Sequence, residues 1–458
     1  MTNYHESMTV SEQRAALALA GILSTRMLGL FMILPVFALY AHTLPNVTPT
    51  LVGLAIGIYG LTQAIFQIPL GILSDRFGRK PIITVGLVIF ALGSLIAALS
   101  SSIIGIIIGR ALQGSGAVSS AILALTADLT REEHRTKAMA FLGSSMGISF
   151  TLALILGPTL NQWIGVPGIF GLTALLSLIA LAVLYLIVPQ PLTKQSLQHT
   201  ESIRVQFKQI LTNTQLLRLN IGILLLHFFL TSLFVVLPIV LKAKLDLEYH
   251  WQVYVPVLVS SFLVIVPVII YAEKRQLLKP IFVSAITLLV LGLFGLSYLY
   301  YYLSGIIGML LLFFIAFNLL EASLPSLLSK IAPAEYKGAA MGIYSTAQFL
   351  GAFLGGFGGG WLHHHYGIKS IFIVDAILAT IWLILAITAK NPRYLSSHLL
   401  NIGQLNKQQA NQLSHCLTQV PGVAEVVIIL EEGVAYLKVD RQVLDMTALN
   451  NCYIKLHY

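Results

Sequence analysis

The stretch GILSDRFGRKP, residues 71–81, joins two long apolar runs at residues 51–70 and 82–99. Each run is about long enough to cross the hydrocarbon core of a membrane, which takes roughly 20 residues of helix. The stretch itself places glycines, an acid and several bases between the runs. This pattern predicts a tight turn at a membrane surface, with a membrane-spanning helix on either side.

The spacing of the polar residues within this turn indicates more than membrane anchoring. Gly71 and Gly78 permit a sharp turn and a close approach of helices. Asp75 at a membrane boundary needs a partner, which a cation or a helix N-terminus would supply. Arg79 and Lys80 also suit simple anchors on the cytoplasmic side, but anchoring alone does not explain an acid and two glycines at fixed positions.

The composition places most of the chain in a membrane. Of its 458 residues 57% are hydrophobic and only 10% are charged, whereas soluble chains carry about 25% charged residues. A soluble protein this apolar could not cover its core, so lipid must cover much of it. We predict an all-α membrane protein with twelve transmembrane helices. The apolar runs are residues 15–41, 51–70, 82–99, 103–127, 138–160, 168–188, 217–241, 254–271, 281–300, 305–328, 339–362 and 368–389.

The charges predict the orientation in the membrane. The net charge is +9, and most Lys and Arg residues fall in loops on one side, whereas Lys242, Lys244 and Lys369 fall on the other. Basic loops stay on the cytoplasmic side. We therefore expect a multi-pass protein of the bacterial inner membrane with both termini in the cytoplasm. Its partners would be membrane lipids and a small molecule, and not nucleic acid.

The chain divides into two halves, a linker and a tail. Residues 131–143 resemble residues 333–345, and a repeat in the same orientation implies two related bundles. The apolar spacing of residues 202–211 suits an amphipathic helix on the membrane face, the alternative being a frayed polar segment. The expected units are a six-helix bundle at residues 1–188, a cytoplasmic linker at 189–216, a second six-helix bundle at 217–390 and a small domain at 396–458.

The tail has the pattern of a soluble α+β domain. Its predicted order is β-α-β-β-α-β, with a helix at residues 443–449 and a last strand at 453–456, which matches a ferredoxin-like fold. Cys416 and Cys452 give neither a metal spacing nor a disulfide framework. We expect a module for a regulatory ligand or partner rather than a metal site.

The turn at residues 71–81 also identifies a family. Its pattern G-x-x-x-D-R-x-G-R-K resembles the loop signature of the major facilitator superfamily. The stretches STRMLGLFMILPVF, GLAIGIYGLTQAIFQIPL and GRALQGSGA resemble one group of bacterial transporters in that family, whose members also carry a small cytoplasmic C-terminal domain. The resemblance covers roughly all twelve predicted spans. It implies the major facilitator fold and a secondary transporter that works by alternating access.

The resemblance implies a conformational latch at this turn. In the family the acid of the motif, here Asp75, contacts the N-terminal end of the eleventh helix in the outward-open state, near Gly338. The second Arg, here Arg79, pairs with an acid at the cytoplasmic end of the fourth helix, here Asp128. A carboxylate at a helix N-terminus contributes about 0.3–1 kcal/mol, enough to bias two states. The expected latch residues are Gly71, Asp75, Arg76, Gly78, Arg79, Lys80 and Asp128.

Ionisable residues inside the spans form a second set of candidates. A charge near the bilayer centre costs at least about 2.5–3.5 kcal/mol on insertion scales, so such side chains face a cavity or a partner. The alternative is pairing that only holds helices together. The stretch RALQG at residues 110–114 resembles the fourth-helix motif of the family, whose Arg is associated with proton coupling, and Glu321 is the best candidate for a proton carrier. The expected proton-coupling or cavity residues are Arg26, Arg110, Gln113, Asn318, Glu321 and His227.

Two further patterns limit the assignment. Drug antiporters of the family carry G-x-x-x-G-P-x-x-G-G in the fifth helix, but here Ala153 replaces the first glycine and Asn161 and Gln162 replace the last two. Three consecutive histidines, residues 363–365, cannot converge on one ion from one helix or strand. We therefore expect neither a metal nor another cofactor.

Taken together, these patterns predict a proton-coupled transporter that moves a small molecule by alternating access, with efflux the favoured direction. Arg26 and Arg110 suit an anionic or polar substrate bound near the middle of the membrane. A membrane-embedded enzyme would need a catalytic constellation, and because the sequence offers none we expect no enzymatic activity. The remaining alternative is a transporter-like sensor that signals through residues 396–458.

Overall fold

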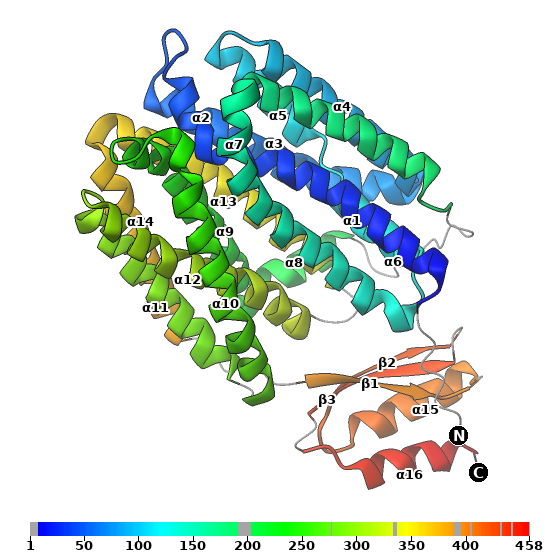
Figure 1. Cartoon of the computed structure of the whole chain (residues 1–458). Coiled ribbons are helices and arrows are strands. Elements are labelled where there is room, and N and C mark those ends of the chain that lie inside the picture. The colour runs from blue at the N-terminus through cyan, green and yellow to red at the C-terminus, as the bar shows by residue number, and fades with distance from the viewer. Residues whose placement is uncertain are drawn as a thin grey trace.

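The computed structural model describes residues 8–190, 203–275, 277–332, 337–388, 395–403, 405–430, 433–440 and 443–457. Two groups of long helices lie side by side, and a small domain of strands and helices lies at one end of them (Figure 1). Helix covers part or all of each of the twelve predicted apolar runs.

The first group of helices forms the N-terminal half. Pro35 ends the first helix early, because proline has no amide hydrogen to donate to the preceding turn and instead suits the first turn of a new helix. Gly165, at φ 66°, breaks the last and longest helix into two parts. The elements are α1 (Val10–Phe31), α2 (Leu34–Ala41), α3 (Pro49–Phe77), α4 (Arg79–Leu99), α5 (Ile103–Ser115), α6 (Ser119–Asp128) and α7 (Glu132–Leu186).

The second group forms the C-terminal half, preceded by the linker helix. In that helix Ile210 is buried, whereas Lys208 and Gln209 are exposed, as expected of an amphipathic helix. Residues 191–202 of the linker and residues 333–336 of the predicted repeat lie outside the described residues. The elements are α8 (Ile203–Thr212), α9 (Thr214–Lys242), the short helix η1 (Leu247–Tyr249), α10 (Trp251–Arg275), α11 (Leu278–Leu299), α12 (Leu303–Ile331), α13 (Lys337–Tyr366) and α14 (Ile368–Ile387).

Ten stretches of the described residues are long and apolar enough to cross a membrane. One of them, within α7, is 50 residues long and contains the break at Gly165. The 30-residue α13 is not among the ten, because its glycines and its three histidines lower its mean hydropathy. The structure thus has a helix for each apolar run, and the number of membrane crossings stays a prediction.

The two halves touch along a line of glycines, which we call the glycine seam: Gly53, Gly57 and Gly60 of α3 against Phe353, Gly356 and Gly360 of α13. A Cβ added to Gly53 would lie 2.2 Å from the carbonyl oxygen of Gly356 and 2.8 Å from the Cα of Gly360. The helices therefore meet backbone to backbone, which small residues alone permit. At one end of the seam Thr50 Oγ1 lies 3.0 Å from His364 Nδ1.

Away from the seam the two halves diverge. A Cβ added to Gly338 or Gly342, at the other end of α13, would meet nothing within 4 Å. Figure 1 shows the two groups of helices spreading apart toward the end at which the small domain lies. We call this end the basic face, because Arg79 and Arg131 lie there.

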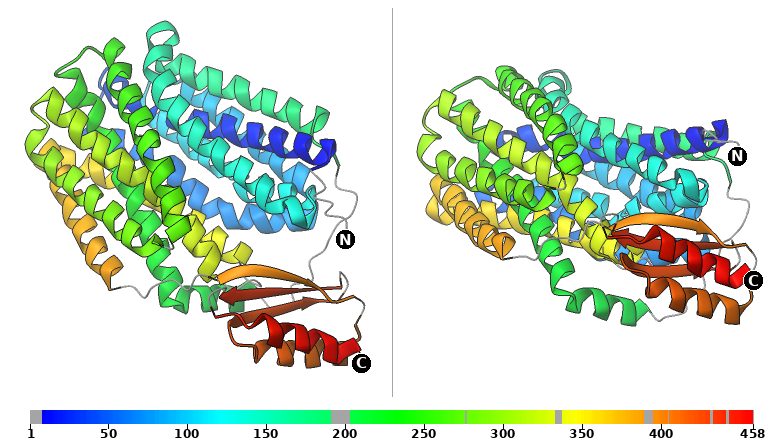
Figure 2. Two further views of the ribbon diagram at one scale, coloured as in Figure 1. Left: turned by 60° about the horizontal axis from the view of Figure 1, so that its bottom comes forward. Right: turned by 90° about the horizontal axis from the view of Figure 1, so that it is seen from below.

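The C-terminal domain has a three-stranded antiparallel sheet in the order β1-β3-β2. Both helices cover the same face of the sheet (Figures 1 and 2). Leu413 and Leu417 of one helix and Leu449 of the other pack on Leu437 of the central strand. The elements are β1 (Leu395–Asn401), α15 (Lys407–Thr418), β2 (Val423–Ile429), β3 (Val434–Asp440) and α16 (Met446–His457).

The predicted last strand of this domain is wrong, because residues 453–456 lie within α16. The side chain of Asp445 caps that helix by accepting hydrogen bonds from the amides of Thr447 and Ala448 at 2.9 and 3.0 Å. The cap moves the helix start later than predicted, and Leu449 and Cys452 then lie on its buried side. The described domain is therefore β-α-β-β-α, which keeps the split β-α-β order but lacks the fourth strand of a ferredoxin-like fold.

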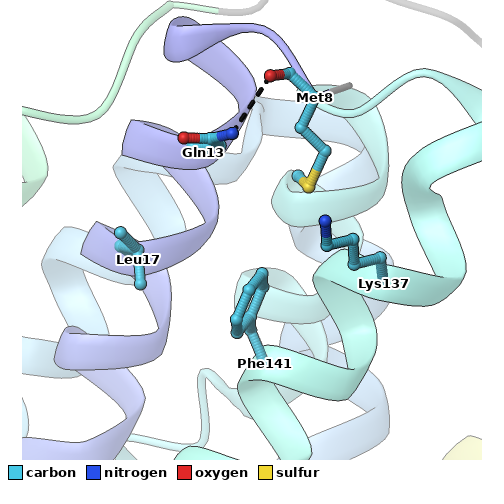
Figure 3. Close-up of a pocket in the computed structure, with 5 residues that line it drawn as sticks. All are labelled: Met8, Gln13, Leu17, Lys137 and Phe141. Carbon is cyan, nitrogen blue, oxygen red and sulfur yellow. Dashed lines mark hydrogen bonds between the residues drawn. The ribbon is translucent and has the colours of Figure 1, made fainter. Parts of the chain in front are cut away.

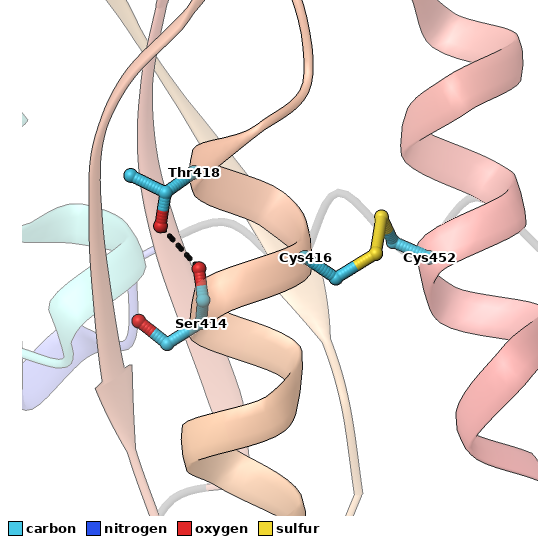
Figure 4. The surroundings of a disulfide bond; sticks show 4 residues. All are labelled: Ser414, Cys416, Thr418 and Cys452. Atoms are coloured by element: carbon cyan, nitrogen blue, oxygen red, sulfur yellow. Dashed lines mark hydrogen bonds between the residues drawn. A yellow bond between two sulfur atoms is a disulfide. The ribbon is translucent and has the colours of Figure 1, made fainter.

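The prediction that the two cysteines form no disulfide is also wrong. Cys416 of α15 and Cys452 of α16 are joined by a disulfide across the helix pair (Figure 4). They are 36 residues apart in sequence, and only the packing of the two helices brings them together. Spacing alone could not show this pairing.

The glycine seam yields a first prediction. Gly53→Val should force α3 from α13, because overpacking of this kind costs about 1–3 kcal/mol, enough to lower the closed fraction several-fold. The measurement is the yield of a disulfide between Thr50→Cys and His364→Cys in a chain whose own cysteines are replaced by serine, with Gly171→Val as control because a Cβ there meets nothing within 4 Å. An equal yield in the Gly53→Val and Gly171→Val chains would contradict the seam.

The disulfide yields a second prediction. On the chain-entropy relation, opening a loop of 36 residues removes up to about 4 kcal/mol of stability. Dithiothreitol should therefore speed hydrogen exchange in α15 and α16 of the full chain. The double variant Cys416→Ser, Cys452→Ser should exchange fast with or without reductant. If dithiothreitol did not change the hydrogen-exchange rate of α15 and α16 in the parent chain, the disulfide would not stabilise this domain.

Candidate functional site

Arg26 of α1 is the centre of a buried polar cluster in the N-terminal half. Its Nη2 donates to Tyr59 Oη and to Gln63 Oε1, each at 3.2 Å, and its Nη1 lies 3.5 Å from Ser119 Oγ. Its guanidinium carbon lies 5.3 Å from the centre of the Phe90 ring. The side chain is fully buried, and within the described residues its Nε has no hydrogen-bond partner.

Arg110 of α5 lies on the other side of Tyr59, with its guanidinium carbon 5.1 Å from that ring. It donates to two backbone carbonyls of α3 at 3.3 Å and to Gln113 Oε1 at 3.1 Å. Gln113 in turn donates to Ser94 Oγ at 2.7 Å. Among the described residues neither Arg110 nor Arg26 is paired with a carboxylate. Both buried guanidiniums contact Tyr59, Arg110 at the ring and Arg26 at the hydroxyl.

The C-terminal half has its own polar cluster, built by three helices. Gln348 of α13 donates to Glu321 Oε1 of α12 at 3.2 Å and lies 2.8 Å from His227 Nε2 of α9. Because an amide nitrogen can only donate, His227 Nε2 accepts, and the ring carries its proton on Nδ1. That Nδ1 lies 3.9 Å from Glu321 Oε2. The sequence predicted His227 and Glu321 separately, and the structure brings them together.

The Glu321 side chain is partly exposed and has one oxygen without a hydrogen-bond partner in the described structure. Its side chain is 38% exposed, yet its Oε2 is buried and has no hydrogen-bond partner in the part of the chain that the structure describes. The buried hydroxyl of Tyr344, one turn before Gln348, is likewise without a partner there. Two unpaired polar groups on neighbouring helices indicate a place where a proton, water or ligand atom binds.

Asn318 does not join this cluster. It donates to Ser261 Oγ of α10 at 3.1 Å and so ties α12 to α10. Of the predicted cavity residues, it fits the alternative of helix-to-helix pairing. Asp375 of α14, which is fully buried and accepts a hydrogen bond from Ser232 of α9, fits the same description.

Aromatic rings separate the two polar clusters. The Tyr59 ring lies 6.4 Å from the ring of Phe349, the neighbour of Gln348. Beside it, Phe150 of α7 lies 5.8 Å from Phe317 of α12, whose ring lies 5.8 Å from His227. These apolar rings lie between the guanidiniums of the N-terminal half and the carboxyl group of the C-terminal half.

The sequence missed Tyr59, Gln63 and Gln348 as members of these clusters. Gln63 also donates to Gln67 Oε1, one turn on, at 2.9 Å. The only sign in the sequence was a pair of glutamines four residues apart in an apolar run, which places them on one helix face.

The turn between α3 and α4 holds the predicted latch residues. Gly78 has φ 99°, a backbone conformation that side chains disfavour, so glycine is required there. The guanidinium of Arg79 contacts the carboxylate of Asp75, donates to Asp128 Oδ2 at 3.1 Å and donates to Ser74 Oγ at 2.8 Å. Arg79 is only 15% exposed, whereas Asp75 is 58% exposed. In this conformation Asp75 is thus held by Arg79.

The other three predicted latch residues serve the packing around the turn. Lys80 donates to the carbonyl of Val188 at 2.6 Å, which ties α4 to the end of α7. A Cβ on Gly71 would lie 3.1 Å from Ser120 Oγ, so α3 and α6 approach closely there. Arg76 stacks on its neighbour Phe77 at 5.5 Å, is exposed, and does not join the Arg79 contacts.

No described group of three or more His, Cys, Asp or Glu residues is arranged to hold a metal ion. The histidines at 363–365 are the last turns of α13, where His364 contacts Thr50 and His365 Nδ1 lies 3.0 Å from the carbonyl of Trp361.

Comparison with known proteins gives consistent results. The profile of the Major Facilitator Superfamily matches residues 19–356 and 319–404. The chain is 46% identical over 437 residues to the inner membrane transport protein YajR of Escherichia coli K12, covering 95% of this chain and 96% of that one. The fold is similar to that of a bacterial homologue of the human lysosomal transporter Spinster in an inward-facing, occupied conformation. The TM-score is 0.68 at 12% identity, and the match covers 83% of this chain and 97% of that chain.

The fold is also similar to that of a D-xylose–proton symporter. The TM-score is 0.64 at 18% identity, and the match covers 82% of this chain and 98% of that chain.

The Arg79 contacts yield a third prediction. Because Arg79 and Asp128 are partly shielded from solvent, a double-mutant cycle with Arg79→Ala and Asp128→Ala should give a coupling free energy near the upper end of the range of about 0.2–1 kcal/mol found for surface pairs. The measurement is reversible unfolding in detergent. The matched control is the more exposed pair Lys242 and Asp246, which are 48% and 71% exposed and should couple more weakly. Equal coupling in both pairs would contradict this reading.

Proposed function

Because the chain belongs to the Major Facilitator Superfamily, we propose that it is a secondary active transporter that moves a small polar molecule by alternating access, driven by protons. It is a multi-pass membrane protein of a transporter family. We count twelve crossings, with two in α7, divided at Gly165, and one in α13. Its membrane is the bacterial inner membrane, in keeping with the printed name of its relative YajR.

The basic face is cytoplasmic in this proposal. The excess of Lys and Arg in the loops of that face supports the assignment, because basic loops are retained in the cytoplasm. Both termini then lie inside, with the C-terminal domain. The glycine seam closes the outer side, and the two halves part on the inner side. The conformation is accordingly inward-open.

Glu321 carries the coupling proton, and the observation that supports this most is its setting. It is a carboxyl group within a transmembrane helix, with one oxygen unpaired in the described structure, a neutral histidine 3.9 Å away and no described Lys or Arg bonded to it. An ionised carboxylate is costly in an apolar medium, so a closed, dry site favours the protonated form. Opening to water removes that cost and releases the proton.

Arg26 and Arg110 define the other side of the substrate path. Two buried guanidiniums without described carboxylates create a strong positive potential in the N-terminal half. This potential favours a substrate with a negative or strongly polar group, approaching from the side of Gln63 and Gln67.

The turn at residues 71–81 acts as the state latch. In the inward-open form Arg79 holds both Asp75 and Asp128. When the inner side closes, the start of α13 approaches, and its unpaired amides compete for the Asp75 carboxylate. A gain of about 0.3–1 kcal/mol at that contact biases the equilibrium without locking it.

The C-terminal domain is a regulatory module in this proposal. The alternative is a sensor that uses the transporter fold and signals through this domain. Removal of residues 395–458 separates the two: substrate flux that persists without the domain supports a carrier, whereas no flux in either form and loss of a cellular response supports a sensor.

A fourth prediction tests the transport mechanism. In proteoliposomes screened with a panel of small polar and anionic compounds, one compound should accumulate when a pH gradient is imposed. Glu321→Gln should cut gradient-driven accumulation at least about tenfold and keep substrate exchange without a gradient, because a glutamine cannot release a proton. Arg110→Ala should reduce both.

The matched control is Ser323→Ala on the same helix, whose hydroxyl donates to the carbonyl of Leu319 within α12. This variant should transport like the parent. If Glu321→Gln kept its full response to the pH gradient, Glu321 would not be the carrier. If no compound in the panel moved, with or without a gradient, the transporter proposal itself would fail.

A further inference from the structure

A groove lies on the outside of the N-terminal half, where α1 and α7 begin at the basic face. It has a volume of about 210 Å³ and is lined by Met8, Gln13, Leu17, Lys137 and Phe141 (Figure 3). None of these residues belongs to the polar clusters or to the latch. The groove therefore needs an explanation of its own.

The lining residues are ordered by depth along the two helices. Gln13 and Leu17 are one turn apart on α1, and Lys137 and Phe141 are one turn apart on α7. Figure 3 shows Gln13 and Met8 nearest the start of α1, Lys137 at about the level of Leu17, and Phe141 one turn beyond Lys137. The groove thus has one cationic group, with apolar side chains beside and beyond it.

An ion pair between the buried Glu12 and the exposed Arg131 joins the two helices beside this groove. Glu12 Oε1 accepts hydrogen bonds from the amide and the Nε of Arg131, at 2.9 and 3.1 Å, and Glu12 Oε2 accepts from the amide of Thr9 at 2.8 Å. The Glu12 side chain is only 7% exposed, so α1 is clamped to the start of α7. Arg131 is neutralised by this pair.

The exposed side chains favour a lipid over a soluble ligand. Leu17 is 61% exposed and Phe141 is 39% exposed, although both lie in helices of membrane-spanning length. Side chains of this kind on the outer surface of a bundle contact lipid chains. Gln13 donates to the carbonyl of Met8 at 3.1 Å, which leaves Lys137 to meet an anion.

We propose that this groove binds an anionic phospholipid of the cytoplasmic leaflet, with the phosphate on Lys137 and the upper acyl chain against Leu17 and Phe141. The occupant follows from the order of the lining: a basic group with apolar groups beside and beyond it matches the two parts of a phospholipid. A free phosphate would contact the basic group but would gain nothing from the apolar side chains. The leaflet rests on the proposed orientation, whereas the binding itself does not depend on transport.

The test uses the full chain in detergent and native mass spectrometry. Phosphatidylglycerol and phosphatidylcholine with identical acyl chains are titrated into the parent chain and into Lys137→Gln. The parent should retain phosphatidylglycerol in preference to phosphatidylcholine. In Lys137→Gln the ratio of retained phosphatidylglycerol to retained phosphatidylcholine should fall about fivefold. Lys244→Gln is the matched control, since Lys244 is an exposed lysine on the opposite face and its removal should change nothing.

A second arm separates a lipid from a free anion. Leu17→Ser with Phe141→Ser should weaken phosphatidylglycerol retention although Lys137 remains. Inorganic phosphate at the same concentration should not displace the lipid from the parent chain. Full displacement by phosphate, or equal retention in the parent chain and Lys137→Gln, would overturn the proposal. Because no step measures flux, the result stands apart from the success or failure of the transport assay.

Discussion

The backbone contact between α3 and α13 is the constraint on which the rest of the arrangement depends. Gly53, Gly356 and Gly360 bring two helices of opposite halves so close that no side chain fits between them. One end of the molecule is thereby closed by atoms that cannot adopt other rotamers. Any separation of the halves must occur either by parting this seam or at the far end, where α13 is free of close neighbours at Gly338. In the proposed transport cycle, these two ways of separating the halves would open opposite sides of the molecule.

Aromatic rings link the two sets of charged groups. The Tyr59 ring contacts the Arg110 guanidinium and lies 6.4 Å from the ring of Phe349, whose neighbour Gln348 donates to Glu321. In a medium of low dielectric constant such charges act on one another over long distances, because little water screens them. Electrostatic coupling between the two halves therefore needs no direct hydrogen bond between the two clusters.

Physical chemistry explains which features the sequence predicted. Apolar length predicted the helices, because only a helix satisfies the backbone in lipid. The family motif predicted that Arg79 lies near Asp128, which the structure places 3.1 Å apart. Gln348 escaped notice because a single glutamine in an apolar run carries no periodic pattern. The Cys416–Cys452 bond escaped notice because it depends on how two helices pack, and the last strand was predicted from apolar residues that equally suit the end of a helix.

The disulfide of the C-terminal domain has a mechanical consequence. Cys416 and Cys452 close a covalent ring that contains β2 and β3. A pull on the C-terminal end of α16 therefore passes through the sulfur bridge into α15 and from there along the chain to β1 and α14. The hairpin of β2 and β3 carries none of that load. While the bridge is intact, the covalent path from α16 to α14 bypasses the hairpin; once it is reduced, that path runs through α16, β3 and β2 in turn.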